Sequence, residues 1–191
     1  NLDFTIETGS REVSFHQNGG ALDWEVTVAH TGQSAMTGAR IARAAARYLG
    51  DAEHFAVTYG DGLADVDLAE EYDFHLAHGA EATVLAVHPR SQFGRFELHE
   101  DSVTAFAEKP LSSSEWINGG FFFFRRNFLR RLRAEEDCVL EQAPLRRLAQ
   151  DGDLRVFRHG GFWSCMDTMK DCEDMRTLWE TGAAPWRADV G

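Results

Sequence analysis

Residues 54–87 read HFAVTYGDGLADVDLAEEYDFHLAHGAEATVLAV and carry the clearest fold signal in the chain. They begin with an apolar run at residues 54–59, which breaks at a Gly-Asp-Gly turn around Asp61 and predicts a buried strand. Residues 67–78 follow with apolar side chains at helical spacing, between a capping Asp and a terminating Gly. A second apolar run at residues 82–87 predicts another strand. Strand, helix and strand within about 34 residues predict a βαβ crossover, whose strands run in the same direction.

The remaining patterns extend this unit into a single α/β domain that spans residues 1–191. Four consecutive phenylalanines, Phe121 to Phe124, predict a strand that is buried on both faces. The sheet is expected to be Rossmann-like, mixed and mostly parallel, flanked by helices and carrying a small inserted β-ribbon. Further strands are predicted at 2–6, 13–16, 24–28, 96–98, 103–107 and 154–157, and helices at 38–49, 127–133, 141–150 and 168–180.

Several helical side chains have expected roles. Thr37 is expected to cap the helix at 38–49, and Asp67 with Glu70 has the pattern of a capping box. In the final helix the spacing predicts an inward-facing stripe, made of Met169, Cys172, Met175 and Trp179.

The composition excludes several classes of protein. Nineteen Lys and Arg residues against 31 Asp and Glu residues give a formal net charge of −12, which repels nucleic-acid backbones and anionic membranes. No apolar run reaches the roughly 18 residues of a membrane-spanning helix. The three cysteines, Cys138, Cys165 and Cys172, form no CxxC pair and are expected to be free thiols in a reducing cytoplasm. The eight histidines lack the spacing of zinc ligands.

Two aspartates are candidates for a divalent-metal site. Asp61 lies at the carboxyl end of the strand at 54–59, where open α/β sheets bind ligands, and Asp167 lies where a late strand meets the last helix. Two carboxylates from separate strand ends could share one Mg²⁺ ion and leave positions for phosphate oxygens. The alternatives are a turn aspartate that accepts backbone N–H bonds for Asp61, and a cap of the final helix made by Asp167 with Thr168. The nearby Asp65 and Asp67 are interpreted as cap residues.

Three loops contain further candidates for substrate binding. Glu108-Lys109-Pro110 closes a strand, so Lys109 could hold a sugar phosphate and Glu108 could bind sugar hydroxyls, or the two form an exposed ion pair. Asn118-Gly119-Gly120 offers either a close-approach surface or a plain turn. Residues 32–40 enter a helix through small residues, which suits an anion or a base edge, or a simple cap.

Together these motifs resemble those of the sugar-1-phosphate nucleotidyltransferases. The resemblance spans nearly the whole chain, and the Met-Thr-Gly-x-Arg and Met-Asp-Thr segments are similar to the branch of the family that transfers cytidylyl groups to glucose 1-phosphate. It implies the nucleotide-diphospho-sugar transferase type of fold and a homo-oligomer. The matching motifs, in order, are Thr31-Gly32, Met36-Thr37-Gly38-Ala39-Arg40, residues 59–67, Phe93-Gly94, Glu108-Lys109-Pro110, residues 117–122, Gly161-Phe162-Trp163, Met166-Asp167-Thr168 and Ala184-Pro185-Trp186.

The resemblance also implies a reaction and a role for each matching residue. CTP and α-D-glucose 1-phosphate would give CDP-glucose and pyrophosphate, with Mg²⁺ as the cofactor. The catalytic set would consist of the two metal ligands Asp61 and Asp167 and the phosphate-binding Lys109. Residues on the hexose would be Gly94, Glu108, Asn118 and Gly119, and residues against the cytidine would be Thr37, Gly38 and Arg40.

One family element is absent from these residues. The family carries a loop of the form Gly-Gly-x-Gly-Thr-Arg, followed by Lys-Pro, which cradles the triphosphate, and no copy occurs here. Since the first residues already alternate like a strand, the chain is expected to be an N-terminally truncated part of a longer enzyme. Two other hypotheses stay open: a non-catalytic sugar-nucleotide-binding relative, and a glycosyltransferase built on a related sheet.

Overall fold

A computed structural model describes residues 4–7, 9, 12–15, 25–89, 95–107 and 115–187. The chain divides into two compact units, Asn1–His30 and Thr31–Gly191, and each is described by itself. A single domain over residues 1–191 stays a prediction. Among the described residues, none of the helices combines the length and the apolar character that crossing a membrane requires.

The first unit contains an antiparallel hairpin where the first two strands were predicted. β1 (Phe4–Glu7) pairs antiparallel with β2 (Glu12–Phe15), and Phe4 lies opposite Phe15. The strand predicted at 24–28 is wrong for residues 25–28, which form no strand. The Val28 side chain is 95% exposed. An alternating apolar pattern forms a strand only where its side chains pack against neighbours, and this side chain packs against almost nothing.

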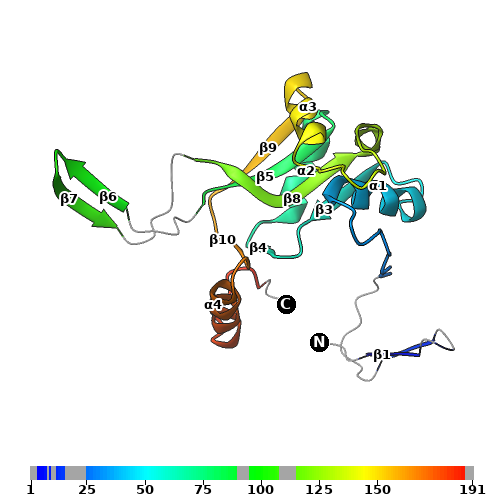
Figure 1. The fold of residues 1–191 in the computed structure, drawn as a ribbon, viewed down its shortest axis with the longest axis horizontal. Coiled ribbons are helices and arrows are strands. Elements are labelled where there is room, and N and C mark those ends of the chain that lie inside the picture. The colour runs from blue at the N-terminus through cyan, green and yellow to red at the C-terminus, as the bar shows by residue number, and fades with distance from the viewer. Residues whose placement is uncertain are drawn as a thin grey trace. The chain divides into compact units, whose positions relative to one another are not determined.

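The second unit is built on a four-stranded mixed sheet in the order β3-β8-β5-β9 (Figure 1). Its strands are β3 (His54–Thr58), β5 (Ala82–Val87), β8 (Ile117–Arg125) and β9 (Leu154–His159). β8 is antiparallel to β3 and to β5, whereas β5 and β9 are parallel. Three of the four strands therefore run in one direction, which confirms the mixed, mostly parallel sheet. The strands of the predicted βαβ unit are not direct neighbours, because β8 lies between them.

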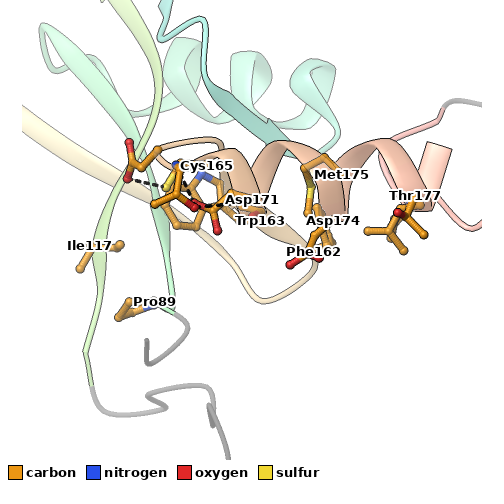
Figure 2. Close-up of a pocket in the computed structure, with 14 residues that line it drawn as sticks. Pro89, Ile117, Phe162, Trp163, Cys165, Asp171, Asp174, Met175 and Thr177 are labelled. Atoms are coloured by element: carbon orange, nitrogen blue, oxygen red, sulfur yellow. Dashed lines mark hydrogen bonds between the residues drawn. The ribbon is translucent and has the colours of Figure 1, made fainter. Parts of the chain in front are cut away.

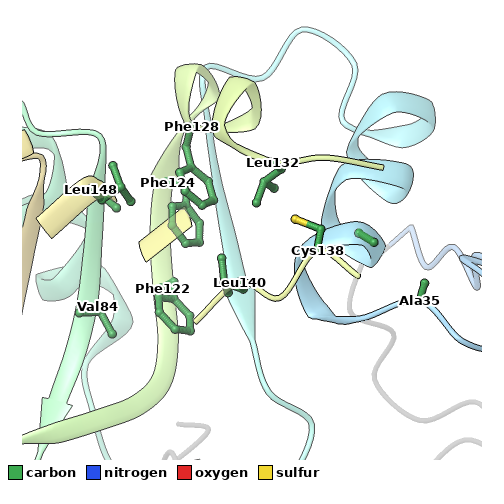
Figure 3. Close-up of a cluster of buried hydrophobic side chains, with 11 residues drawn as sticks. Ala35, Val84, Phe122, Phe124, Phe128, Leu132, Cys138, Leu140 and Leu148 are labelled. Atoms are coloured by element: carbon green, nitrogen blue, oxygen red, sulfur yellow. The ribbon is translucent and has the colours of Figure 1, made fainter. Parts of the chain in front are cut away.

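The phenylalanine strand β8 lies inside the sheet, between β3 and β5, and both of its faces are covered. Phe122 and Phe124 are 1% and 0% exposed and belong to a core that includes Ala39 of α1 and Leu148 of α3 (Figure 3). On the opposite face, the ring of Phe123 lies 5.2 Å from that of Tyr72 on α2. The helices are α1 (Thr37–Tyr48), α2 (Leu68–His78), α3 (Ala143–Asp151), α4 (Met169–Glu180) and the 3₁₀ helix η1 (Arg126–Arg131).

Two small β elements complete the second unit. β6 (Arg95–His99) and β7 (Ser102–Ala107) form an antiparallel hairpin between β5 and β8 in the chain, as predicted for the inserted ribbon. β4 (Gly62–Ala64) pairs antiparallel with β10 (Trp163–Cys165), and the sequence did not predict this pair. Strands of three residues are too short for an alternating pattern to reveal them.

The predicted helix caps are partly right. Asp67 caps α2, since its Oδ1 accepts hydrogen bonds from Ala69 N at 2.8 Å and Glu70 N at 3.2 Å, and Gly79 ends the helix with φ +72°. The prediction for Thr37 is wrong. Met36 is the N-cap of α1 and makes no side-chain cap, while Thr37 is the first helical residue.

The inward-facing stripe predicted for α4 is also largely wrong. Met175 is buried at 9% exposure and Cys172 is partly buried, but Met169 and Trp179 are 76% and 54% exposed. A pocket rather than a closed core runs along this helix, so only the part of the stripe around Met175 is covered.

Candidate active site

The pairing of β4 with β10 brings the two predicted metal ligands to the same end of a small ladder. Gly62 lies opposite Cys165, and Met166 N donates a hydrogen bond to the backbone oxygen of Asp61 at 2.8 Å. Asp61 directly precedes β4, and Asp167 lies two residues beyond the end of β10. Because the strands are antiparallel, the residue before one and the residues after the other are neighbours. The backbones of Asp61 and Asp167 therefore lie at the same end of this ladder, and a metal ion held between their carboxylates stays a prediction.

Asp61 lies in a turn, whereas Asp167 is not the N-cap of α4. The cap of α4 is Thr168, which accepts from Asp171 N, while the Asp171 carboxylate accepts from Thr168 N at 2.9 Å. Asp167 Oδ2 instead accepts a hydrogen bond from Cys165 Sγ at 3.1 Å. Within the described ranges, no backbone N–H donates a hydrogen bond to the side chain of Asp61. An aspartate that stabilises a turn would accept such a bond.

The electrostatics of Cys165 show how acidic this corner is. The pKa of the Cys165 thiol is raised to about 11. Burial contributes most, followed by the hydrogen bond to Asp167 and by the negative charges of Asp167, Asp171 and Asp61. Three carboxylates thus act on one side chain, and such a concentration of negative charge favours a bound cation.

The donor set suits a metal ion that is shared with a substrate. In the part of the chain that the structure describes, no three His, Cys, Asp or Glu side chains are arranged to hold a metal by themselves. Mg²⁺ is commonly held by one or two carboxylates together with phosphate oxygens and water. Asp61 and Asp167 fit that arrangement.

A pocket of about 1020 Å³ lies beside Asp167, between β10 and α4 (Figure 2). Apolar side chains form much of its wall, and Asp167, Asp171 and Asp174 contribute the acidic groups. The apolar lining residues are Pro89, Ile117, Phe162, Trp163, Met175, Leu178 and Pro185. A concave apolar surface beside convergent carboxylates is typical of a small-molecule site.

Asn118 and Gly119 lie at the start of β8, directly after the pocket-lining residue Ile117. Asn118 Oδ1 accepts a hydrogen bond from Gly120 N at 2.9 Å, and its Nδ2 lies 3.5 Å from the Tyr59 hydroxyl. A Cβ on Gly119 would lie 3.0 Å from Val87 Cγ1, so this glycine lets β8 pass close to β5. The oxygen of Gly119 also accepts from Trp163 Nε1 at 2.8 Å, which ties β8 to β10.

The predicted cytidine loop is held mainly by contacts within the protein. Gly38 is buried, and a Cβ there would lie 2.8 Å from Cys138 Sγ, so close packing of α1 requires this glycine. Arg40 donates to Thr31 Oγ1 and to the oxygen of Gln33, both at 3.2 Å, and thereby closes the loop that precedes α1. Thr37 Oγ1 donates to Glu141 Oε2 at 2.9 Å. Contact of these residues with a nucleobase stays a prediction.

Two side chains with clear roles were missed or misread from the sequence. Glu141 bonds both Thr37 and the hydroxyl of Tyr59, and no spacing could have shown this, because they lie 104 and 82 positions away. Asp65 is not a cap residue: its Oδ1 accepts from Phe162 N and His159 Nε2, both at 2.7 Å, and so fixes the loop that leads into β10. Gly94, Glu108 and Lys109, which the sequence also predicted for the site, lie outside the described residues.

The mixed four-stranded sheet and its helices give the chain an α/β fold, and a separate two-stranded ladder carries the candidate aspartates at one end. The sequence model of the nucleotidyl transferase family matches residues 5–173, and the chain belongs to this family.

Individual relatives agree with this assignment. The chain is 44% identical over 164 residues to glucose-1-phosphate cytidylyltransferase from Salmonella typhimurium, which is 86% of this chain and 63% of that protein. It is 37% identical over 183 residues to a Bacillus subtilis protein provisionally assigned the same activity, which is 96% of this chain and 70% of the relative. A Bacillus anthracis structure, provisionally assigned as a glucose-1-phosphate thymidylyltransferase, shares the fold at 16% identity, with a TM-score of 0.56 over 84% of this chain and 65% of that one.

Proposed function

We propose that the protein transfers a cytidylyl group from CTP to α-D-glucose 1-phosphate, which gives CDP-glucose and pyrophosphate. The observation that carries the proposal is the placement of Asp61 just before β4 and of Asp167 just after β10, at the same end of that ladder, in a chain 44% identical to a Salmonella glucose-1-phosphate cytidylyltransferase. Asp167 also lines the pocket. The chain spans less than two thirds of that relative, so the activity is assigned to the protein at its natural length.

In the proposed reaction a phosphate oxygen of glucose 1-phosphate forms a bond to the α-phosphorus of CTP. The bond from that phosphorus to the oxygen bridging to the β-phosphate breaks, and its electron pair leaves with pyrophosphate. Nucleotidyl transferases generally use a divalent metal, and we assign Mg²⁺, which would neutralise phosphate charge between Asp61 and Asp167. The protein's own part is to hold the two phosphates in line and to exclude water.

The remaining predicted residues are assigned to the two substrates. The hexose is placed in the pocket near Ile117, Trp163 and Asp167, an apolar wall with polar groups at its edge. The hexose residues are Gly94, Glu108, Asn118 and Gly119, the phosphate residue is Lys109, and the cytidine residues are Thr37, Gly38 and Arg40. A cytoplasmic homo-oligomer is part of this proposal, and the free state of all three cysteines supports a reducing compartment.

The decisive experiment measures pyrophosphate release by the natural-length protein with glucose 1-phosphate, Mg²⁺ and CTP, UTP or dTTP. We expect release with CTP in preference to the other two. Asp61→Asn and Asp167→Asn should each lower kcat/KM by about a hundredfold or more, because each removes a charge that holds the metal. Asp137→Asn is the matched control, since Asp137 is exposed and, within the described ranges, its ion pair is with Arg133, four positions earlier in the chain.

A second candidate is a non-catalytic protein that binds sugar nucleotides. The same experiment separates the two. Affinity for CDP-glucose without any pyrophosphate release at natural length would establish the binding protein and contradict the transferase.

A further inference from the structure

Glu141 joins two parts of the site through its two carboxylate oxygens. Its Oε2 accepts a hydrogen bond from Thr37 Oγ1 at 2.9 Å, and its Oε1 accepts one from the hydroxyl of Tyr59. Thr37 begins α1, and Tyr59 lies between β3 and the turn that holds Asp61. Since a carboxylate has no proton to donate, the two hydroxyls are the donors.

The contacts of Thr37 determine where its hydroxyl proton points. Leu140 N donates to Thr37 Oγ1 at 2.9 Å, and the single hydroxyl proton is directed to Glu141. A hydroxyl has one proton and two lone pairs, so these contacts leave one lone pair for a further partner. Toward any ligand, Thr37 therefore acts only as a hydrogen-bond acceptor. Figure 3 shows Leu140 and Cys138 on the segment that lies beside the start of α1.

Tyr59 holds Glu141 in this orientation. The Tyr59 hydroxyl donates its proton to Glu141 Oε1. Its ring packs against Gly120, where a Cβ would lie only 2.8 Å from Tyr59 Cδ2. A half-buried donor is costly to leave unpaired, so the Tyr59 hydroxyl stabilises Glu141 in its place between Tyr59 and Thr37.

We propose that Glu141 is a positioning residue for base selection. By holding the Thr37 hydroxyl as an acceptor, it favours a nucleobase with an amino group at that edge, as in cytosine, over one with a carbonyl oxygen, as in uracil. The inference rests on the proposed function, in which Thr37 lies against the cytidine. An amino group donates to the free lone pair, whereas a carbonyl oxygen meets a second acceptor and stays unpaired. A mismatch of this kind corresponds to roughly tenfold or more in affinity.

The test compares CTP with UTP, which differ on that base edge alone. In the natural-length protein, kcat/KM and equilibrium dissociation constants are measured for both nucleotides in wild type, Thr37→Val, Thr37→Ser and Glu141→Met. Valine keeps the shape of Thr37 without its acceptor, and methionine keeps the length of Glu141 without its oxygens. We expect the CTP:UTP ratio to fall about tenfold in Thr37→Val and Glu141→Met, and to persist in Thr37→Ser.

A merely structural role for Glu141 predicts a different result, because it would lower the values for CTP and UTP together and leave their ratio unchanged. An unchanged ratio in Thr37→Val overturns the proposal, even where Glu141→Met does not fold. Thr58→Val is the control, since it removes an exposed hydroxyl that contacts only the oxygen of Tyr59, and its ratio should match wild type. Absence of pyrophosphate release from wild type would contradict the proposed function instead, and the ratio of dissociation constants would still decide this inference.

Discussion

Glu71 on α2 is fully buried, and among the described residues neither of its carboxylate oxygens has a hydrogen-bond partner. Burial raises the pKa of this carboxyl from 4.5 to about 7. A buried charge without a partner is unfavourable, so the folded protein keeps Glu71 neutral over a range in which the unfolded chain ionises it. This residue therefore makes the stability of the protein depend on pH.

The sign of that dependence follows from the two pKa values. Since the folded value lies above the unfolded one, the unfolded state releases the proton first, and the free energy of unfolding falls as pH rises from about 4.5 to about 7. The loss amounts to up to about 3 kcal/mol. The glutamine in Glu71→Gln cannot ionise. Urea denaturation at pH 5 and pH 8 gives the free energy of unfolding of the variant and of wild type, and the difference between the two proteins should change between the two pH values by up to that amount.

The difference isolates Glu71 from other groups that titrate nearby. His75 is also buried. Its burial, followed by the charges of the neighbouring His54, His78 and Arg125, lowers its pKa to about 4. Protonation of His75 therefore destabilises the fold as the pH falls. His75 is present in both proteins, so its effect cancels. Glu70→Gln is the control on the exposed side of the same helix. A pH-independent difference between Glu71→Gln and wild type would contradict the assignment.

Among the secondary-structure elements, the start of β8 is the one that most constrains the site. Gly120 has φ +82°, and its oxygen accepts from Tyr59 N at 3.0 Å, so β8 and the end of β3 approach closely. Only a residue without a side chain fits there, because a Cβ would overlap the ring of Tyr59.

Gly120→Ala should therefore destabilise the protein more than the backbone conformation alone requires. The control is Gly152→Ala, because Gly152 has a similar φ of +75° but nothing within 4 Å of the added Cβ. We expect Gly120→Ala to lower the free energy of unfolding by about 1–3 kcal/mol more than the control does, since Tyr59 must move. Equal losses in thermal or chemical denaturation would show that the ring of Tyr59 gives way freely.

For the whole molecule, the proposed metal site links ligand binding to stability. A ligand that binds only the folded protein stabilises it by about 2.7 kcal/mol at a hundredfold excess over its dissociation constant. At natural length, CTP with Mg²⁺ should therefore raise the melting temperature, and EDTA should remove most of that gain. Asp167→Asn should show little gain under either condition, whereas Asp137→Asn should behave as wild type. A full gain for CTP in the presence of EDTA would contradict the metal assignment.

The sequence was sufficient for the central features of the fold. The apolar runs around residues 54–59 and 82–87, the helix between them and the phenylalanine strand all correspond to elements of the structure. These signals are local, because the spacing of apolar residues within one segment is enough to indicate a buried strand or an amphipathic helix. Local motifs also single out Asp61 and Asp167 as candidates, and their role as metal ligands stays a prediction.

The tertiary structure decided what depends on distant partners. β4 and β10 are too short to carry a pattern, yet their pairing is what brings Asp61 and Asp167 together. The exposure of Met169 and Trp179 depends on which surface covers α4, and their spacing along the helix contains no information about that. Glu141 acquires its role from Thr37 and Tyr59, which no local pattern connects to it. The spacing of apolar residues indicates which face of a segment is buried. Which other segment packs against that face depends on residues far away in the sequence, and is decided only when the chain folds.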